Sequence, residues 1–202
     1  MEKISNSTGR GNLSFGIFFI AISIAVALAS ILGEIASFNK WPYYYDTIIW
    51  IGSFSIVFIA LLYNKRNRIW TDLRNRMKSS IKWPIHAKIL NAICWAGPFS
   101  AIALIPSYLP YLILAGIGFG NITTYFLLKR YKRVDRNNND NGGYTGRGQF
   151  IVGLISLVAI PIVFEIYTTF AVKEDIVALL SRFSISFAYA AGGIYDIMIG
   201  KK

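Results

Sequence analysis

Two charged residues, Glu165 and Arg182, stand inside long apolar runs and are the first candidates for chemistry. Each lies about eight residues from positions 173–174, where we expect the chain to turn between two helices. Equal spacing from the turn of an antiparallel hairpin predicts equal depth. Because an unpaired arginine inside a membrane costs several kcal/mol, we predict an ion pair between these residues. Such a pair either locks the hairpin or forms a gate or site for a charged substrate.

Three further polar residues interrupt apolar runs: Asn91, Asn121 and Asp196. Asparagine within a membrane helix commonly forms a hydrogen bond to a neighbouring helix. Asp196 lies close to Lys201 and Lys202, so we expect its carboxylate to reach toward water or to pair with basic segments. The three residues are candidates for a polar pathway through the membrane.

The residue inventory excludes several kinds of site. The single cysteine, Cys94, excludes an intrachain disulfide and a CxxC metal site, and the single histidine, His86, excludes a multi-histidine metal site. The sequence has neither a phosphate-binding Gly-x-x-x-x-Gly-Lys loop nor a His-Glu-x-x-His motif. We therefore expect no metal, no cofactor and no enzymatic activity, and we interpret His86 as an interfacial residue rather than a base.

The composition is that of a membrane protein. The 202 residues are 54% hydrophobic and 15% charged, whereas a soluble domain carries about 25% charged residues. We predict one integral membrane domain over residues 1–202, an all-α bundle of six transmembrane helices. The expected spans are 13–33, 46–63, 87–105, 109–128, 149–171 and 176–198.

Basic residues are concentrated in the segments on one side of the expected spans. All 21 except Lys40, Lys173 and Arg182 fall within segments 1–12, 64–88, 129–148 and 199–202. Cytoplasmic segments of membrane proteins are enriched in lysine and arginine. This pattern predicts a multi-pass protein of the cell membrane with both termini in the cytoplasm.

The segment 66–82 has the pattern of an amphipathic helix on the inner membrane face. Ile69, Leu73 and Met77 share one side of the helical wheel, and basic residues occupy much of the remainder. We expect anionic lipid headgroups to bind here. The candidate residues are Trp70, Arg74, Arg76, Lys78, Lys82 and Trp83. Alternatively, the segment is a basic loop that only fixes topology. The polar segment 133–147 is expected to be flexible.

Small residues recur every four positions in three of the expected spans. They allow helices to approach closely, so we predict that these stripes face other helices, within the chain or across an oligomer. The stripes are Ala21, Ala25, Ala29 and Gly33 in the first span, Gly116 and Gly120 in the fourth, and Ser184, Ala188 and Gly192 in the sixth.

The sequence leaves two functions open. The first is a non-enzymatic accessory or structural membrane protein that binds anionic lipid and partner helices, from other subunits or from a second copy. The second is a small transporter or channel that uses Glu165, Arg182 and Asn121. The net charge of +11 fits basic cytoplasmic segments, and we expect no nucleic acid partner. Convergence of the polar residues on one cavity would favour transport, and their separation among helix contacts would favour the first function.

Overall fold

The computed structural model describes residues 2–42, 44–62, 69–71, 74, 83–131 and 146–201, with side chains described except at 2–10 and 61–62. Within these residues the chain is helical and has no strand, which confirms the all-α class. The main elements are α1 (Glu2–Phe38), α2 (Tyr44–Leu62), α4 (Ile85–Ala101), the short 3-10 helix η2 (Pro106–Tyr108), α5 (Leu109–Tyr131), α6 (Arg147–Phe170) and α7 (Glu174–Gly200).

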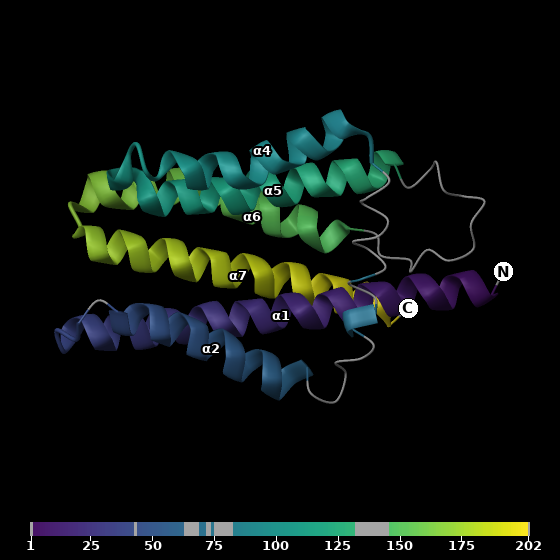
Figure 1. Cartoon of the computed structure of the whole chain (residues 1–202), viewed down its shortest axis with the longest axis horizontal. Coiled ribbons are helices and arrows are strands. Elements are labelled where there is room, and N and C mark those ends of the chain that lie inside the picture. Colours follow the sequence, from purple (N-terminus) through teal and green to yellow (C-terminus); the bar gives the residue numbers. More distant parts are fainter. Residues whose placement is uncertain are drawn as a thin grey trace.

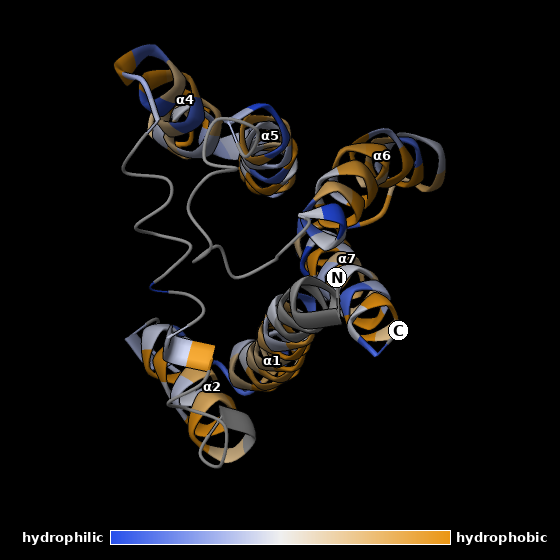
Figure 2. Cartoon of the chain, turned by 90° about the vertical axis from the view of Figure 1, so that its right-hand side faces the viewer, coloured by the Kyte–Doolittle hydropathy of each residue, from blue (hydrophilic) through white to orange (hydrophobic). Residues whose placement is uncertain are grey.

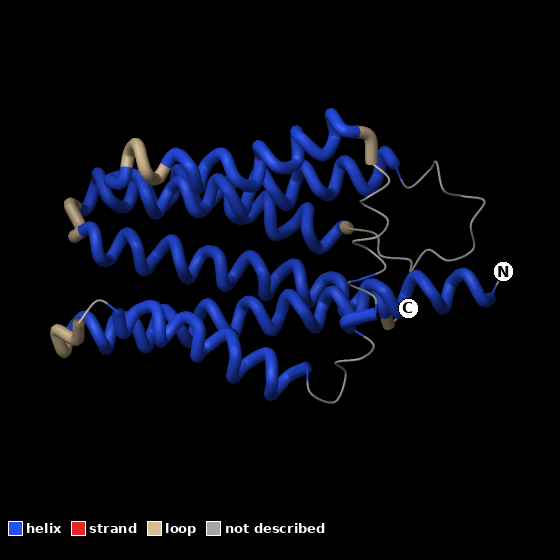
Figure 3. Tube along the Cα trace, viewed as in Figure 1, coloured by secondary structure: helices blue, strands red, loops and turns tan. Residues whose placement is uncertain are grey.

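The long helices run in alternating directions along one axis, and both chain termini lie at the same end (Figure 1). We call this the terminal end; α4 and α6 begin here and α5 and α7 end here. At the opposite end, short connections join α1 to α2, α4 to α5, and α6 to α7 (Figure 3). We call this the hairpin end.

Among the described residues, four helices are long and apolar enough to cross a membrane, which is consistent with a membrane protein. They comprise Gly11–Phe38, Pro106–Tyr131, Arg147–Phe170 and Glu174–Gly200. α2 contributes a shorter apolar stretch, Tyr44–Ala60, and α4 has 17 residues. α4 ends at Ala101 rather than at the expected residue 105. Ile105 has φ −135° and ψ 67°, outside the helical region that a following proline disfavours, so no helix continues into Pro106.

The helices follow one another in an open row, in the order α2, α1, α7, α6, α5 and α4 (Figure 2). α5 also contacts α7, while α2 and α4 stand at the two ends of the row and pack mainly against one neighbour each. The principal core is formed by side chains of the inner helices, including Phe19, Val26, Leu114, Val152, Ile185 and Tyr189. The two outermost helices are therefore the most exposed.

The stripes of small residues lie at helix contacts inside the chain. Ala21, Ala25 and Ala29 are fully buried on α1. On α5, Gly116 and Gly120 are covered by aromatic rings of α4. On α7, Gly192 approaches the backbone of Gly148 in α6. The expectation that the stripes face other helices is confirmed for these residues, and their contacts lie within the monomer.

Candidate functional site

Arg182 of α7 lies at the centre of a charged cluster toward the hairpin end. Its Nη1 atom is 3.8 Å from Oε1 of Glu34 on α1, with 27% of the arginine side chain and 36% of the glutamate side chain exposed. The guanidinium carbon also lies 5.8 Å from the ring centroid of Trp50 on α2, within the range of a cation–π interaction. One side chain thus connects three helices.

A second carboxylate, that of Asp46 on α2, lies beside Gly33 of α1, the residue that precedes Glu34. A Cβ atom built on Gly33 would stand 3.1 Å from Oδ1 of Asp46 and 3.8 Å from Nη1 of Arg182. The absence of a side chain at Gly33 therefore leaves room for both groups. Asp46 is in the first turn of α2, where the helix dipole favours a negative charge.

We call Glu34, Asp46, Trp50 and Arg182 the hairpin-end charge cluster. It contains two carboxylates and one guanidinium, so its formal charge is negative by one. Its groups are partly exposed, and an ion pair at such a site is weak in water but stronger in a less polar surrounding. The arrangement can hold α1, α2 and α7 together, and it can offer carboxylate oxygens to a cationic group.

The predicted pair between Glu165 and Arg182 is wrong for the described structure. Glu165 is exposed on α6, and its Oε1 accepts a hydrogen bond from Oγ1 of Thr169 at 2.9 Å. Glu165 follows the buried Val163 by two residues, a rotation of about 200° on a helix, so it faces away from the packed side. Equal spacing from a turn predicts depth but does not determine the face of the helix.

Asn91 belongs to a polar contact between α4 and α5. Nε1 of Trp95 donates a hydrogen bond to Oγ1 of Thr124 at 3.1 Å. The Thr124 hydroxyl lies 2.9 Å from Oδ1 of Asn91 and 2.7 Å from the carbonyl oxygen of Gly120, and it donates its single proton to one of them. The contact joins two helices in the way expected of an intramembrane asparagine.

Asn121 makes its contacts on a different side of α5. Its Nδ2 donates to the carbonyl oxygen of Ile117 at 2.8 Å, and its amide also interacts with the hydroxyl of Tyr189 on α7. Asn121 is 2% exposed. Asn91 and Asn121 therefore serve two separate helix contacts, α4 with α5 and α5 with α7.

Asp196 does not reach toward water as expected, because it is fully buried near the terminal end of α7. Its Oδ1 accepts a hydrogen bond from the backbone N–H of Gly148 at 3.1 Å. Gly148 lies in the first turn of α6, where unpaired N–H groups and the helix dipole favour a carboxylate. The close approach of Gly148 and Gly192 brings these helices near enough for this contact.

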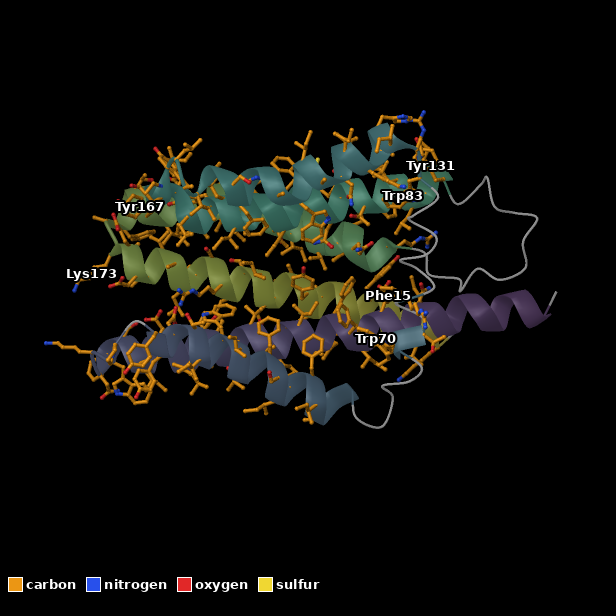
Figure 4. The ribbon with its side chains drawn as sticks, viewed as in Figure 1. Phe15, Trp70, Trp83, Tyr131, Tyr167 and Lys173 are labelled. Carbon is orange, nitrogen blue, oxygen red and sulfur yellow. The ribbon has the colours of Figure 1, made fainter. Side chains whose placement is uncertain are left out.

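The predicted headgroup-binding residues are described only in part. Trp70 is 70% exposed and Arg74 is also exposed, whereas Arg76, Lys78 and Lys82 lie outside the described residues. Trp83 is buried against Ala87 and Leu127 rather than projecting outward. Trp70 and Trp83 both lie toward the terminal end (Figure 4). Most of segment 66–82, and segment 133–147 apart from its last two residues, lie outside the described structure.

Sequence reasoning missed the partners of Arg182. Glu34 directly follows Gly33, the last member of the small-residue stripe on α1, and Asp46 opens the next helix. A stripe that packs against another helix places its neighbours at the edge of that contact. This signal points to Glu34 as a partner for a charge on the adjoining helix.

Comparisons with protein-family models, curated proteins and solved structures find no match to this chain.

Proposed function

We propose that the chain is a non-enzymatic accessory or structural protein of the cell membrane, which binds partner helices and anionic lipid. The observation that carries this proposal is the distribution of its polar side chains. Asn91 lies between α4 and α5, Asn121 between α5 and α7, and Asp196 between α6 and α7. Arg182 joins α7 to α1 and α2. Polar groups distributed in this way stabilise helix contacts, whereas a transport pathway requires them to face one cavity.

The exposed faces of α2 and α4 are the surfaces proposed for partner helices. The small-residue stripes already serve contacts within the chain, so they are not the surfaces that a partner would use. α2 and α4 pack mainly against one neighbour each. Their exposed large apolar side chains are Ile48, Ile51, Ile56 and Ile59 on α2 and Ile85, Ile89, Leu90, Ile93 and Phe99 on α4.

The proposed topology has six spans with both termini in the cytoplasm. The described basic residues near the helix ends divide unequally. Lys40 and Lys173 are at the hairpin end, whereas the terminal end has Lys88, Lys129, Arg130, Arg147 and Lys201. A cysteine introduced at Lys173, in a Cys94→Ala background, should react with an impermeant reagent from outside the cell. A cysteine at Lys201 should react only after permeabilisation. The reverse pattern would reject the topology.

Photo-crosslinking tests the partner surface. A photoreactive residue at Ile56 on α2 or Ile93 on α4, both more than half exposed, should give a discrete crosslinked product in native membranes. The same residue at the buried Val57 is the matched control on α2. Crosslinks to lipid alone from both exposed positions would reject partner binding through these faces.

One observation favours the alternative function, a small transporter or channel. The hairpin-end charge cluster holds three ionisable groups beside apolar helices. Liposomes containing the purified protein test this function by ion and solute flux. A flux that is abolished by Glu34→Gln or Arg182→Gln, but not by Glu165→Gln, would place transport ahead of the accessory role.

A further inference from the structure

The contact between the start of α4 and the end of α5 gathers aromatic and basic side chains around Tyr131. Trp83, Ala87 and Leu127 are buried together, and Tyr131 packs against them while remaining partly exposed. Trp83 and Tyr131 lie near one another at the terminal end (Figure 4), with ring centroids 6.5 Å apart. The buried residues fix the position of the Tyr131 ring.

Polar and charged groups lie on the exposed side of this ring. Nε2 of His86 is 3.3 Å from the Tyr131 hydroxyl oxygen. The guanidinium carbon of Arg130 is 5.9 Å from the Tyr131 ring centroid. The phenol therefore holds an imidazole at its hydroxyl and a guanidinium near its ring. We call His86, Arg130 and Tyr131, with Trp83 packed beside them, the Tyr131 cluster.

The two segments that form the Tyr131 cluster carry basic residues and no acidic ones. α5 ends with Lys129 and Arg130, and Lys88 is exposed in the first turns of α4. Segments 83–90 and 124–131 contain no acidic residue. A group that binds here meets positive charge and hydrogen-bonding groups without a competing carboxylate from either segment.

Apolar side chains flank His86 of the cluster on α4. Ile85 and Ile89 are both more than half exposed. A phospholipid presents an anionic headgroup and then acyl chains to a helix end. The basic and aromatic patch suits the headgroup, and the exposed apolar residues suit the acyl chains. A soluble anion would use only the basic part.

We propose that the Tyr131 cluster binds the phosphate headgroup of an anionic glycerophospholipid, whose acyl chains follow Ile85 and Ile89. This inference rests on the proposed membrane location and deepens its lipid-binding part. Arg130 supplies charge, the Tyr131 hydroxyl and the His86 imidazole supply hydrogen bonds, and Trp83 holds the phenol ring in position. The site differs from the one predicted for segment 66–82: the two share only Trp83, which here packs against the ring of Tyr131.

The test uses the purified full-length chain in detergent, titrated with phosphatidylglycerol or phosphatidylcholine and analysed by native mass spectrometry. The wild-type protein should bind phosphatidylglycerol in preference to phosphatidylcholine. Arg130→Gln should weaken phosphatidylglycerol binding about fivefold, the effect of one basic residue at a membrane surface. Tyr131→Phe keeps the ring but removes the hydroxyl, and it should also weaken binding. Arg147→Gln is the control because Arg147 is exposed at the same end but begins α6.

Three results would overturn the proposal. The first is equal binding of the two lipids by the wild-type protein. The second is an equal loss of phosphatidylglycerol in Arg130→Gln and Arg147→Gln, which would indicate diffuse attraction to basic charge. The third is displacement of the lipid by inorganic phosphate, which would make the ligand a soluble anion.

Two controls separate failure of the site from other failures. Gel filtration and thermal unfolding of each variant verify that the bundle is intact, and Tyr131→Phe serves as the conservative variant if Arg130→Gln fails to fold. Cysteine labelling tests the topology independently of lipid binding in detergent. Loss of lipid preference with correct labelling rejects the site alone, whereas preserved preference with reversed labelling rejects the proposed topology.

Discussion

Glycine brings helices together in two different ways in this molecule. Along the seam formed by α1, α7 and α6, two pairs of glycines bring backbone against backbone, Gly16 with Gly193 and Gly148 with Gly192. A Cβ atom on Gly16 would stand 2.7 Å from the carbonyl oxygen of Gly193, and one on Gly148 would stand 2.7 Å from that of Gly192. Real Cβ atoms do not approach backbone this closely. Side-chain atoms of Ile197 and Asp196 lie closer still to these two positions, but the carbonyl oxygens of Gly193 and Gly192 cannot move without their helices.

The contact between α4 and α5 uses glycine to seat aromatic rings. The Phe99 ring covers Gly116, and the Trp95 ring covers Gly120. A ring can rotate about its side-chain bonds, so this contact can adjust to a small change. The comparison predicts that α1, α7 and α6 form the rigid part of the bundle, while α4 is held by contacts that tolerate repacking.

The largest expected effect comes from filling the seam. Gly16→Ala places a methyl group against the backbone of Gly193 and Ile197, so the helices must separate. We expect a loss of about 1–3 kcal/mol in the free energy of unfolding, measured by denaturant titration in mixed micelles. Gly52→Ala is the matched control because no atom lies within 4 Å of its Cβ position. Equal stability of the two variants would contradict the rigid seam.

A methyl group added at the contact between α4 and α5 should lower the free energy of unfolding by less than one added at the seam. A second substitution should restore part of that free energy. The nearest atoms to the methyl group of Gly120→Ala belong to the Trp95 ring, and we expect a loss of about 1 kcal/mol, the lower end for overpacking. Adding Trp95→Leu should recover part of this loss because the smaller side chain leaves room for the methyl group. Ile197→Ala should not rescue Gly16→Ala, since the Gly193 carbonyl remains in place. Rescue in both cases would remove the distinction between the two contacts.

Substitutions in the hairpin-end charge cluster test whether its ion pair adds to the stability that glycine packing provides along the seam. Glu34→Gln and Arg182→Gln should each lower the free energy of unfolding by less than about 1 kcal/mol, because both groups are partly exposed. Arg182→Gln should be the more harmful, since it leaves two carboxylates near each other without a cation, whereas Glu34→Gln leaves Arg182 beside Asp46. The double variant should recover part of the loss. Glu165→Gln should be neutral, and additive losses at Glu34 and Arg182 would mean that the pair contributes no coupling.

The sequence predicts most of the helices, but it does not predict which side chains contact Arg182 and Asp196. Apolar runs predict α1 and α5 to α7 because lipid-facing and core-facing residues are both apolar, and the small-residue stripes predict which faces meet. The Arg182 partner was missed because spacing from a turn does not specify rotation about the helix axis. The burial of Asp196 was missed because it depends on the first turn of α6, which supplies the Gly148 N–H. That contact requires the helices to be assembled.

The smallest expected effect concerns a hydrogen bond inside the rigid seam. The Ser186 hydroxyl lies 2.9 Å from the carbonyl oxygen of Ser23 and 3.1 Å from its hydroxyl, which joins α7 to α1. Ser186→Ala should cost about 0.6 kcal/mol, the average for hydrogen bonds between membrane helices. Ser184→Ala is the control, because that hydroxyl donates to Leu180 of its own helix at 2.8 Å. If Ser186→Ala cost as much as Gly16→Ala, polar pairing rather than close backbone packing would hold the seam. If it costs less, as expected, the serine pair fixes the rotation of two helices that packing already holds together.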